Sequence, residues 1–330
     1  MAELKGQLLA KDADILPPSD DRIFKVLLTH NDAKRVLIDI ISAVIEQKVT
    51  DVQIRNVELP KSDTEEKGQR FDVNCTIENG DQVEVEMHST PIFETGNKRR
   101  NFINKCTYFL TDLHSSQKSR GKEYFKLVKT YQVTFTSHPV FSRHPDFVSR
   151  FTLRDKEGRV FTNQINQIII ELSKLNDILE RPVEQLTAFE KWLLFLRFAP
   201  DTLQRDKINA IIKEKEEIGM AATILQEISQ DEKERAIFRS QKKFEMDMYS
   251  NMMTLKRIEE RGEKRGEKRG EKRGEKRGEK RGEERSDKKW QVIVAEKDRT
   301  IARNALAKGS TPEFVSEITG LSLDEIAKLL

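Results

Sequence analysis

The stretch Phe71-Asp-Val-Asn-Cys-Thr-Ile-Glu-Asn-Gly-Asp-Gln-Val-Glu-Val-Glu-Met-His88 has the pattern of two β-strands joined by a tight turn. Apolar and polar residues alternate on both sides of Asn79-Gly80, which is typical of strands that bury one face. Asn followed by Gly is favoured in short hairpin loops because Gly adopts positive φ without strain. The stretch therefore predicts a β-hairpin with strands over 71–77 and 82–88.

The length of the hairpin loop decides which side chains share a face. A two-residue turn puts Asp72 and Glu86 on opposite faces. A three-residue loop, Glu78–Gly80, pairs Asp72 directly with Glu86 and gives Gly80 the bulge position. Only this second register collects the apolar residues of both strands on one side: Val73, Cys75, Ile77, Val83, Val85 and Met87. We therefore expect Asp72 and Glu86 to face each other on the polar side.

Helical and extended segments alternate on either side of the hairpin. Apolar residues at helical spacing predict helices after Ser19-Asp20 and over 97–117. Extended patterns predict strands over 52–59 and 124–135, with further strands at 151–153 and 167–172. The order helix, three strands, helix, strand predicts an α/β fold with a mixed sheet and a helical C-terminal extension.

Composition and charge divide the 330 residues further. The net charge of +3, from 59 basic and 56 acidic residues, neither requires nor excludes nucleic acid. The N-terminus lacks an apolar signal region and no apolar run approaches membrane-spanning length, so we expect a cytoplasmic protein without membrane contact. The expected parts are a polar lead-in over 1–18, an α/β domain over 19–175, a helical extension over 176–260, a linker over 261–289 and a helical hairpin over 290–330.

A four-residue repeat fills the expected linker. Arg-Gly-Glu-Lys occurs five times from Arg261 and is followed by Arg281-Gly-Glu-Glu. In a helix the repeat would place like charges at i and i+4, and each Gly would cost about 1 kcal/mol relative to Ala. We therefore predict a flexible or marginally helical spacer.

The tail carries clear helix boundaries. Pro312 follows the cap residue Thr311, Gly320 supplies a C-terminal cap, and 322–325 form a capping box. Two short helices are compatible with a helix-turn-helix DNA-binding unit. A third helix and a basic recognition face are not evident, so the sequence favours a small packing hairpin that could support self-association.

The facing carboxylates suggest a chemistry. Asp72 and Glu86 on neighbouring strands form a hard, oxygen-rich pair suited to Mg²⁺ or Mn²⁺. In phosphodiester hydrolysis such an ion polarises the phosphoryl oxygen, activates water and stabilises the leaving oxyanion. His88 lies beside Glu86 as a third polar group. The pattern alone equally fits a solvated strand face. No phosphate-binding Gly loop is visible, so no nucleotide cofactor is expected.

A set of short pieces, in this order and spacing, adds specificity: Asp21-Arg-Ile-Phe-Lys25, Asp72-Val73, Gly80, Glu86-Met87, Lys105-Cys-Thr-Tyr-Phe109, Gln117, Gly121, Tyr124, Ile318-Thr-Gly-Leu321 and Asp324-Glu-Ile326. Together they resemble the Rpn family of recombination-promoting nucleases and transposase-like proteins, within the PD-(D/E)XK nuclease superfamily. The resemblance covers residues from about Asp21 to Phe135 and the C-terminal end.

The resemblance implies a restriction-endonuclease-like core and a metal-dependent DNA endonuclease linked to recombination or mobile elements. By position, Asp72 and Glu86 would be ligands of Mg²⁺ or Mn²⁺, and the backbone carbonyl of Met87 would be a further ligand.

Two positions depart from the family pattern. His88 stands where the superfamily has Lys and the family usually has Gln; a neutral imidazole could orient the water, act as base or join the metal shell, or it could mark an inactive site. Lys105 stands where the family usually has Arg, which keeps a cation for the scissile phosphate but loses bidentate geometry. Gln117 is a third catalytic candidate, and the alternative is that it bonds backbone at a helix end.

The basic run Lys98-Arg99-Arg100 is a candidate DNA contact, although it could also be a solvated helix turn. A homodimer through the C-terminal helices is expected from mechanism, since double-strand cleavage often needs two active sites. Three hypotheses remain open: an active endonuclease, a DNA-binding relative without catalysis, and a non-enzymatic interaction or scaffold protein.

Overall fold

The computed structural model describes residues 6–56, 72–90, 96–117 and 124–329. The chain forms two compact units, residues 1–242 and 243–330. The first unit contains a six-stranded sheet in the order β1-β2-β3-β4-β6-β5. Its strands are β1 Val52–Asn56, β2 Asp72–Ile77, β3 Gln82–His88, β4 Thr130–Thr136, β5 Val148–Arg154 and β6 Val160–Glu171. β4 runs parallel to β3 and β6, and the other pairs are antiparallel, so the predicted mixed sheet is confirmed.

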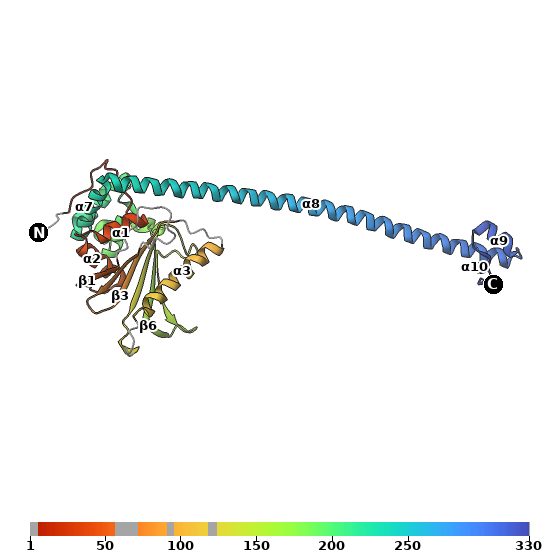
Figure 1. Ribbon diagram of the computed structural model, residues 1–330, viewed down its shortest axis with the longest axis horizontal. Helices are drawn as coiled ribbons and strands as arrows, with labels where there is room; N and C mark the ends of the chain where they lie inside the picture. Colours follow the sequence, from red (N-terminus) through yellow and green to blue (C-terminus); the bar gives the residue numbers. More distant parts are fainter. Residues whose placement is uncertain (1–5, 57–71, 91–95, 118–123, 330) are drawn as a thin grey trace. The chain divides into compact units, whose positions relative to one another are not determined.

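Helices lie on both faces of this sheet (Figure 1). Those of the first unit are α1 Asp21–Thr29, α2 Lys34–Ile45, α3 Gly96–Ser115, α4 Asn176–Leu179, α5 Ala188–Phe198, α6 Arg205–Glu214, α7 Glu216–Gln230 and the start of α8 Glu232–Ala307. The face with α1, α2 and α7 carries the main hydrophobic core, in which Phe24, Val85, Phe135 and Trp192 are fully or almost fully buried. The other face lies under α3, with a small cluster around Phe102, Cys106 and Ile169.

The hairpin has the register predicted from its loop. Asp72 pairs with Glu86, and Val73 pairs with Val85. The amide of Ile77 donates to the carbonyl of Asp81 over 3.0 Å, which leaves three residues in the loop. Gly80 has a φ of 92°, a conformation that L side chains rarely adopt. The three-residue loop thus places Asp72 and Glu86 on the same face.

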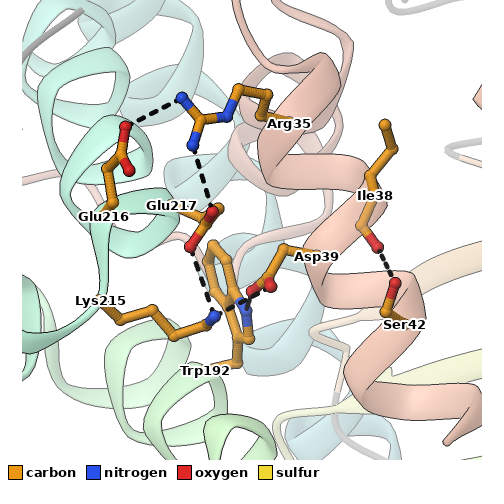
Figure 2. Close-up of polar contacts among 8 residues, drawn as sticks. All are labelled: Arg35, Ile38, Asp39, Ser42, Trp192, Lys215, Glu216 and Glu217. Atoms are coloured by element: carbon orange, nitrogen blue, oxygen red, sulfur yellow. Dashed lines mark hydrogen bonds and ion pairs between the residues drawn. The ribbon is translucent and has the colours of Figure 1, made fainter. Parts of the chain in front are cut away.

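The core continues past residue 175. Figure 2 shows Asp39 of α2 accepting hydrogen bonds from Trp192 Nε1 at 2.6 Å and Lys215 Nζ at 2.9 Å. In the same group, Arg35 pairs with Glu216 over 2.9 Å. These contacts join α2 to α5 and α7 around a fully buried indole. The helices after 175 therefore complete the core of the sheet domain.

Strand boundaries differ from the prediction in two places. Tyr124–Lys126 is a 3₁₀ turn, and β4 begins only at Thr130. β6 begins at Val160, well before the apolar run at 167, because its first half pairs with β5 in an exposed hairpin. Aromatic residues at 124 and 125 suit a strand, but both side chains are exposed, so no core contact holds them in one.

The second unit contains the rest of α8, followed by α9 Pro312–Thr319 and α10 Leu323–Ala327. The Arg-Gly-Glu-Lys repeat is helical throughout and its side chains are exposed, whereas the sequence predicted a flexible or marginal spacer. Three of every four residues in the repeat are good helix formers, which offsets the cost of the glycines. Among the described residues, none of the helices has the length and apolarity to cross a membrane.

Candidate active site

The sheet face under α3 is lined with polar side chains. Glu84 and Glu86 are 3% and 4% exposed, and Thr134 and Thr136 are completely buried. The register places Asp72, Glu86 and Thr134 in one row across β2, β3 and β4. Carboxylates are rarely buried to this extent unless a cation or several donors accompany them. We therefore expect a positively charged group next to these buried carboxylates.

Lys105 supplies one such partner. Its Nζ contacts Oε1 of Glu86, and it reaches there from α3. The Lys105 side chain is 41% exposed while that of Glu86 is 5% exposed, so the ammonium group sits on the solvent side of a buried carboxylate. The predicted phosphate-binding cation and the predicted metal ligand thus lie together.

Asp21 is a further acidic residue near Glu86, and it was not among the residues predicted for the site. It is the first residue of α1, a helix that contacts β2 and β3, and its Oδ1 accepts the amide hydrogen of Ser89 over 2.5 Å. Burial raises the pKa of Asp21 to about 7, and the negative charges of Asp20 and Glu86 act in the same direction. Asp21 opens the 21–25 piece of the family resemblance, which was the available signal.

His88 ends β3 two residues after Glu86. Its ring packs against Phe102, with centroids 5.0 Å apart. Burial lowers the pKa of His88 to about 4, helped by the positive charges of Lys105 and His138. The imidazole is therefore neutral near pH 7 and has one ring nitrogen that can accept a hydrogen bond.

Gln117 lies away from this row. Its Nε2 donates to Thr130 Oγ1 at 2.9 Å and to the Val128 carbonyl at 3.1 Å, and its Oε1 accepts from the Val128 amide at 3.0 Å. Thr130 pairs with Gln82, four residues before Glu86, a separation of about 13 Å along the strand. The Gln117 amide thus anchors the entrance to β4, as the alternative interpretation of this residue expected.

The basic run lies in the first turns of α3. Arg99 and Arg100 are exposed, and the Arg99 guanidinium lies 5.2 Å from the centroid of the Phe141 ring. Lys98 belongs to the same helix, but its side chain lies outside the described part of the structure. The run belongs to the helix that carries Lys105.

In the described part of the chain, no three His, Cys, Asp or Glu side chains lie close enough together to hold a metal ion. The side chain of Asp72 is outside that part, and its place in the row follows from the strand register.

The C-terminal residues 295–330 match the family model described as the Rpn/YhgA-like nuclease family C-terminal HTH domain. The sequence had favoured a packing hairpin because a third helix was not recognised. The structure supplies it, since Ala302 at the end of α8 packs with Val315 of α9 and Ile326 of α10 in a small core. The interpretation as a mere hairpin is therefore corrected to a helix-turn-helix unit.

No significant match was found among curated proteins or among solved structures. Residues 18–254, most of the chain and nearly all of the first unit, match the family model described as PD-(D/E)XK nuclease family transposase. That match includes the mixed sheet, α1, α3 and every residue of the candidate site. The chain belongs to this family of PD-(D/E)XK nuclease transposases.

Proposed function

We propose that the protein is a metal-dependent DNA endonuclease that hydrolyses phosphodiester bonds in recombination or the movement of mobile elements. Asp72 and Glu86 are the proposed ligands of Mg²⁺ or Mn²⁺, with the backbone carbonyl of Met87 as a further ligand. The observation that carries the proposal is the direct pairing of Asp72 with Glu86 on a buried polar face, where Lys105 already contacts Glu86.

The residues present suit a hard divalent cation. The donors are carboxylate and carbonyl oxygens, which Mg²⁺ and Mn²⁺ prefer. The raised pKa of Asp21 reflects burial and two nearby negative charges, so a cation at this place would relieve the repulsion. When bound, the ion would polarise the phosphoryl oxygen and lower the pKa of a coordinated water.

Three side chains of the protein are proposed to bind the phosphate, position the water and strengthen cation binding. Lys105 is proposed to hold the scissile phosphate, for which its ammonium group must exchange Glu86 for a phosphate oxygen. His88, neutral because burial lowers its pKa to about 4, is proposed to orient the attacking water by hydrogen bonding. Asp21 would add negative charge that tightens cation binding.

DNA is the proposed partner of both units. Arg99 and Arg100, with Lys98 in the same helix, would contact the backbone near the cut, and the helix-turn-helix unit would supply further affinity. Dimerisation through the C-terminal helices is proposed as the means of cutting both strands.

A plasmid-nicking assay tests the proposal. Wild type, Asp72→Asn and Glu86→Gln would be compared with Mg²⁺, with Mn²⁺ and with chelator. Glu78→Gln is the matched control, because Glu78 is an exposed carboxylate in the loop of the same hairpin, where it accepts the Thr50 and Asp51 amides. We expect wild type and the control to nick DNA only with metal, and both site variants to be inactive.

Cleavage that persists in Asp72→Asn and Glu86→Gln would remove these residues from the mechanism. A folded wild type that binds DNA without cutting it in either metal would identify a catalytically inactive DNA-binding relative. Loss of DNA binding as well would favour a scaffold role.

A further inference from the structure

The polar face of the sheet extends well beyond the row formed by Asp72, Glu86 and Thr134. The next row across the sheet aligns Asn74 of β2, Glu84 of β3, Gln132 of β4 and Gln167 of β6. The row after that begins with Thr76 and Gln82. The sheet therefore presents a continuous band of amide and hydroxyl groups that leads away from Glu86.

Many polar atoms in this band have no hydrogen-bond partner in the described part of the chain: Asn74 Oδ1, Thr76 Oγ1, Gln82 Oε1, Gln132 Nε2, Gln132 Oε1 and Gln167 Oε1. Gln82 is 8% exposed and Gln132 is completely buried. Buried polar groups are almost always paired in native proteins, and a cluster of exceptions needs an explanation such as a bound group. The described residues therefore leave hydrogen-bonding capacity unused along this band.

A cavity of about 400 Å³ opens at the far end of the band. It is lined by Arg55 of β1, Asn74 and Cys75 of β2, Gln82 of β3, Leu113 of α3 and Ser116 just beyond that helix. Its volume lies within the range of small-ligand pockets. The lining residues include two with amide side chains, Asn74 and Gln82, together with one guanidinium, one hydroxyl and the apolar side chain of Leu113, which is a suitable lining for a flat, polar-edged ring.

We propose that this cavity receives a nucleobase extruded from the DNA strand bound at the catalytic row, an inference that rests on the DNA-binding part of the proposed function. Asn74 and Gln82 would hydrogen-bond the edge of the base, since amide side chains match the paired donor and acceptor groups of bases. Leu113 would pack against the ring, and Arg55 would bind an adjacent phosphate.

The distances suit a nearby nucleotide. Asn74 lies two residues from Asp72 and Gln82 lies four residues from Glu86, or about 7 and 13 Å along the strands. One strand of duplex DNA advances about 3.4 Å per nucleotide. The extruded base therefore lies within about four nucleotides of the scissile phosphate.

The test compares binding of a matched short duplex with the same duplex carrying one mismatched base pair. A mismatched base costs less to unstack, so a protein that extrudes a base binds the mismatched duplex more tightly. All proteins would carry Asp72→Asn to keep the DNA intact, and affinities would come from fluorescence anisotropy. We expect a roughly tenfold preference for the mismatch in the parent protein.

Two substitutions remove the pocket by different routes. Gln82→Leu deletes the unpaired amide, and Ser116→Phe fills the cavity from an exposed position that tolerates a larger side chain. Ser115→Phe, on the neighbouring exposed residue that does not line the cavity, is the matched control. The preference should disappear in both pocket variants and remain in the control.

Fluorescence of 2-aminopurine at the mismatch provides a second readout, which should differ between the parent and Ser116→Phe complexes. An equal affinity of the parent protein for both duplexes, or a full preference in Ser116→Phe, would overturn the proposal. Absence of cleavage by wild type would contradict the nuclease proposal but would leave the mismatch preference intact, so the two failures are distinguishable.

Discussion

The pKa of Asp21 is raised by burial and by the negative charges of Asp20 and Glu86. The folded protein binds the Asp21 proton more tightly than the unfolded chain, because its pKa rises from the ordinary value of 3.8 to about 7. Its favourable contribution is therefore complete below pH 4 and is lost as the pH rises to about 7. Asp21→Asn keeps an acceptor for the Ser89 amide and removes the charge.

We predict that, in chelator, Asp21→Asn gains stability relative to wild type when the pH is raised from 5 to 8. Urea unfolding midpoints at the two pH values would measure this. The same variant should need more Mg²⁺ for cleavage. An identical pH dependence in both proteins would show that Asp21 ionises normally.

His88 allows a prediction about catalysis. With a pKa near 4, the imidazole does not change its charge between pH 6 and pH 9. We predict that His88→Gln, which restores the residue usual in the family, cleaves within about tenfold of wild type. Its pH–rate profile over that range should also keep its shape. Plasmid nicking at several pH values would measure both, and a new or missing ionisation near pH 7 would contradict the buried, neutral imidazole.

The sequence was sufficient to predict how Asp72 and Glu86 pair, because the loop length and the apolar alternation admit only one common register. Lys105 was identified through the family resemblance alone. Asp21 could not be predicted from the residue pattern because its contact with Ser89 joins positions 68 apart in the chain, and no local periodicity indicates such a contact. Gln117 matched a family position, yet local hydrogen bonds to Val128 and Thr130 occupy its amide.

At the scale of the element, the stability of the hairpin should depend on a single loop residue, Gly80. Gly80 has a positive φ. A Cβ added to Gly80 would lie 3.5 Å from a methyl group of Val128, which is an ordinary van der Waals contact. The cost of Gly80→Ala therefore comes from the backbone and should be about 1–2 kcal/mol. Chemical denaturation would measure it. A cost near zero would mean that the loop relaxes into another turn.

The helix-turn-helix core makes a second prediction at this scale. Val315 and Ile326 are completely buried in a cluster with few other members. Val315→Asp places a charge there without a partner and should unfold α9 and α10. Hydrogen exchange should then lose protection in 312–327 and keep it in the sheet, while DNA affinity falls. Glu317→Gln is the surface control. Protection that survives in Val315→Asp would show that this core does not hold the unit together.

Secondary structure was predictable wherever packing against a core requires apolar residues at regular spacing along the sequence. α1, α2 and the two hairpin strands place apolar stripes on the main core, α3 places one on the small cluster across the sheet, and these patterns agree with the structure. Tyr124–Lys126 and the Arg-Gly-Glu-Lys repeat are exposed, so no core contact reinforces or opposes their local preferences. In the repeat the intrinsic propensity of Arg, Glu and Lys outweighs the glycines, a balance too close to decide from spacing alone.

At the scale of the whole molecule, the first unit should be self-sufficient only if it keeps the beginning of α8. Arg22 of α1 makes a bidentate pair with Glu234, at 2.9 and 2.8 Å, and the two side chains are only 9% and 17% exposed. Lys242 pairs with Asp20 over 3.1 Å, next to the site residue Asp21. The first turns of α8 thus hold the end of α1 that carries part of the candidate site.

We predict that a chain ending at Lys242 folds with the wild-type unfolding midpoint and keeps metal-dependent nicking, with weaker DNA binding because the helix-turn-helix unit is gone. A chain ending at Gln230 loses Glu234 as well. Removing one partner of a buried ion pair costs about 3–5 kcal/mol, and the loss here should be smaller because water then reaches Arg22.

Urea unfolding of both truncated chains, beside Glu234→Gln in the full chain, would separate the ion pair from the rest of the helix. If the chain ending at Gln230 is as stable and as active as the one ending at Lys242, the root of α8 has no part in positioning α1. If Glu234→Gln alone reproduces most of the loss, the bidentate pair is the contact that couples the start of α8 to α1 and its candidate site residue Asp21.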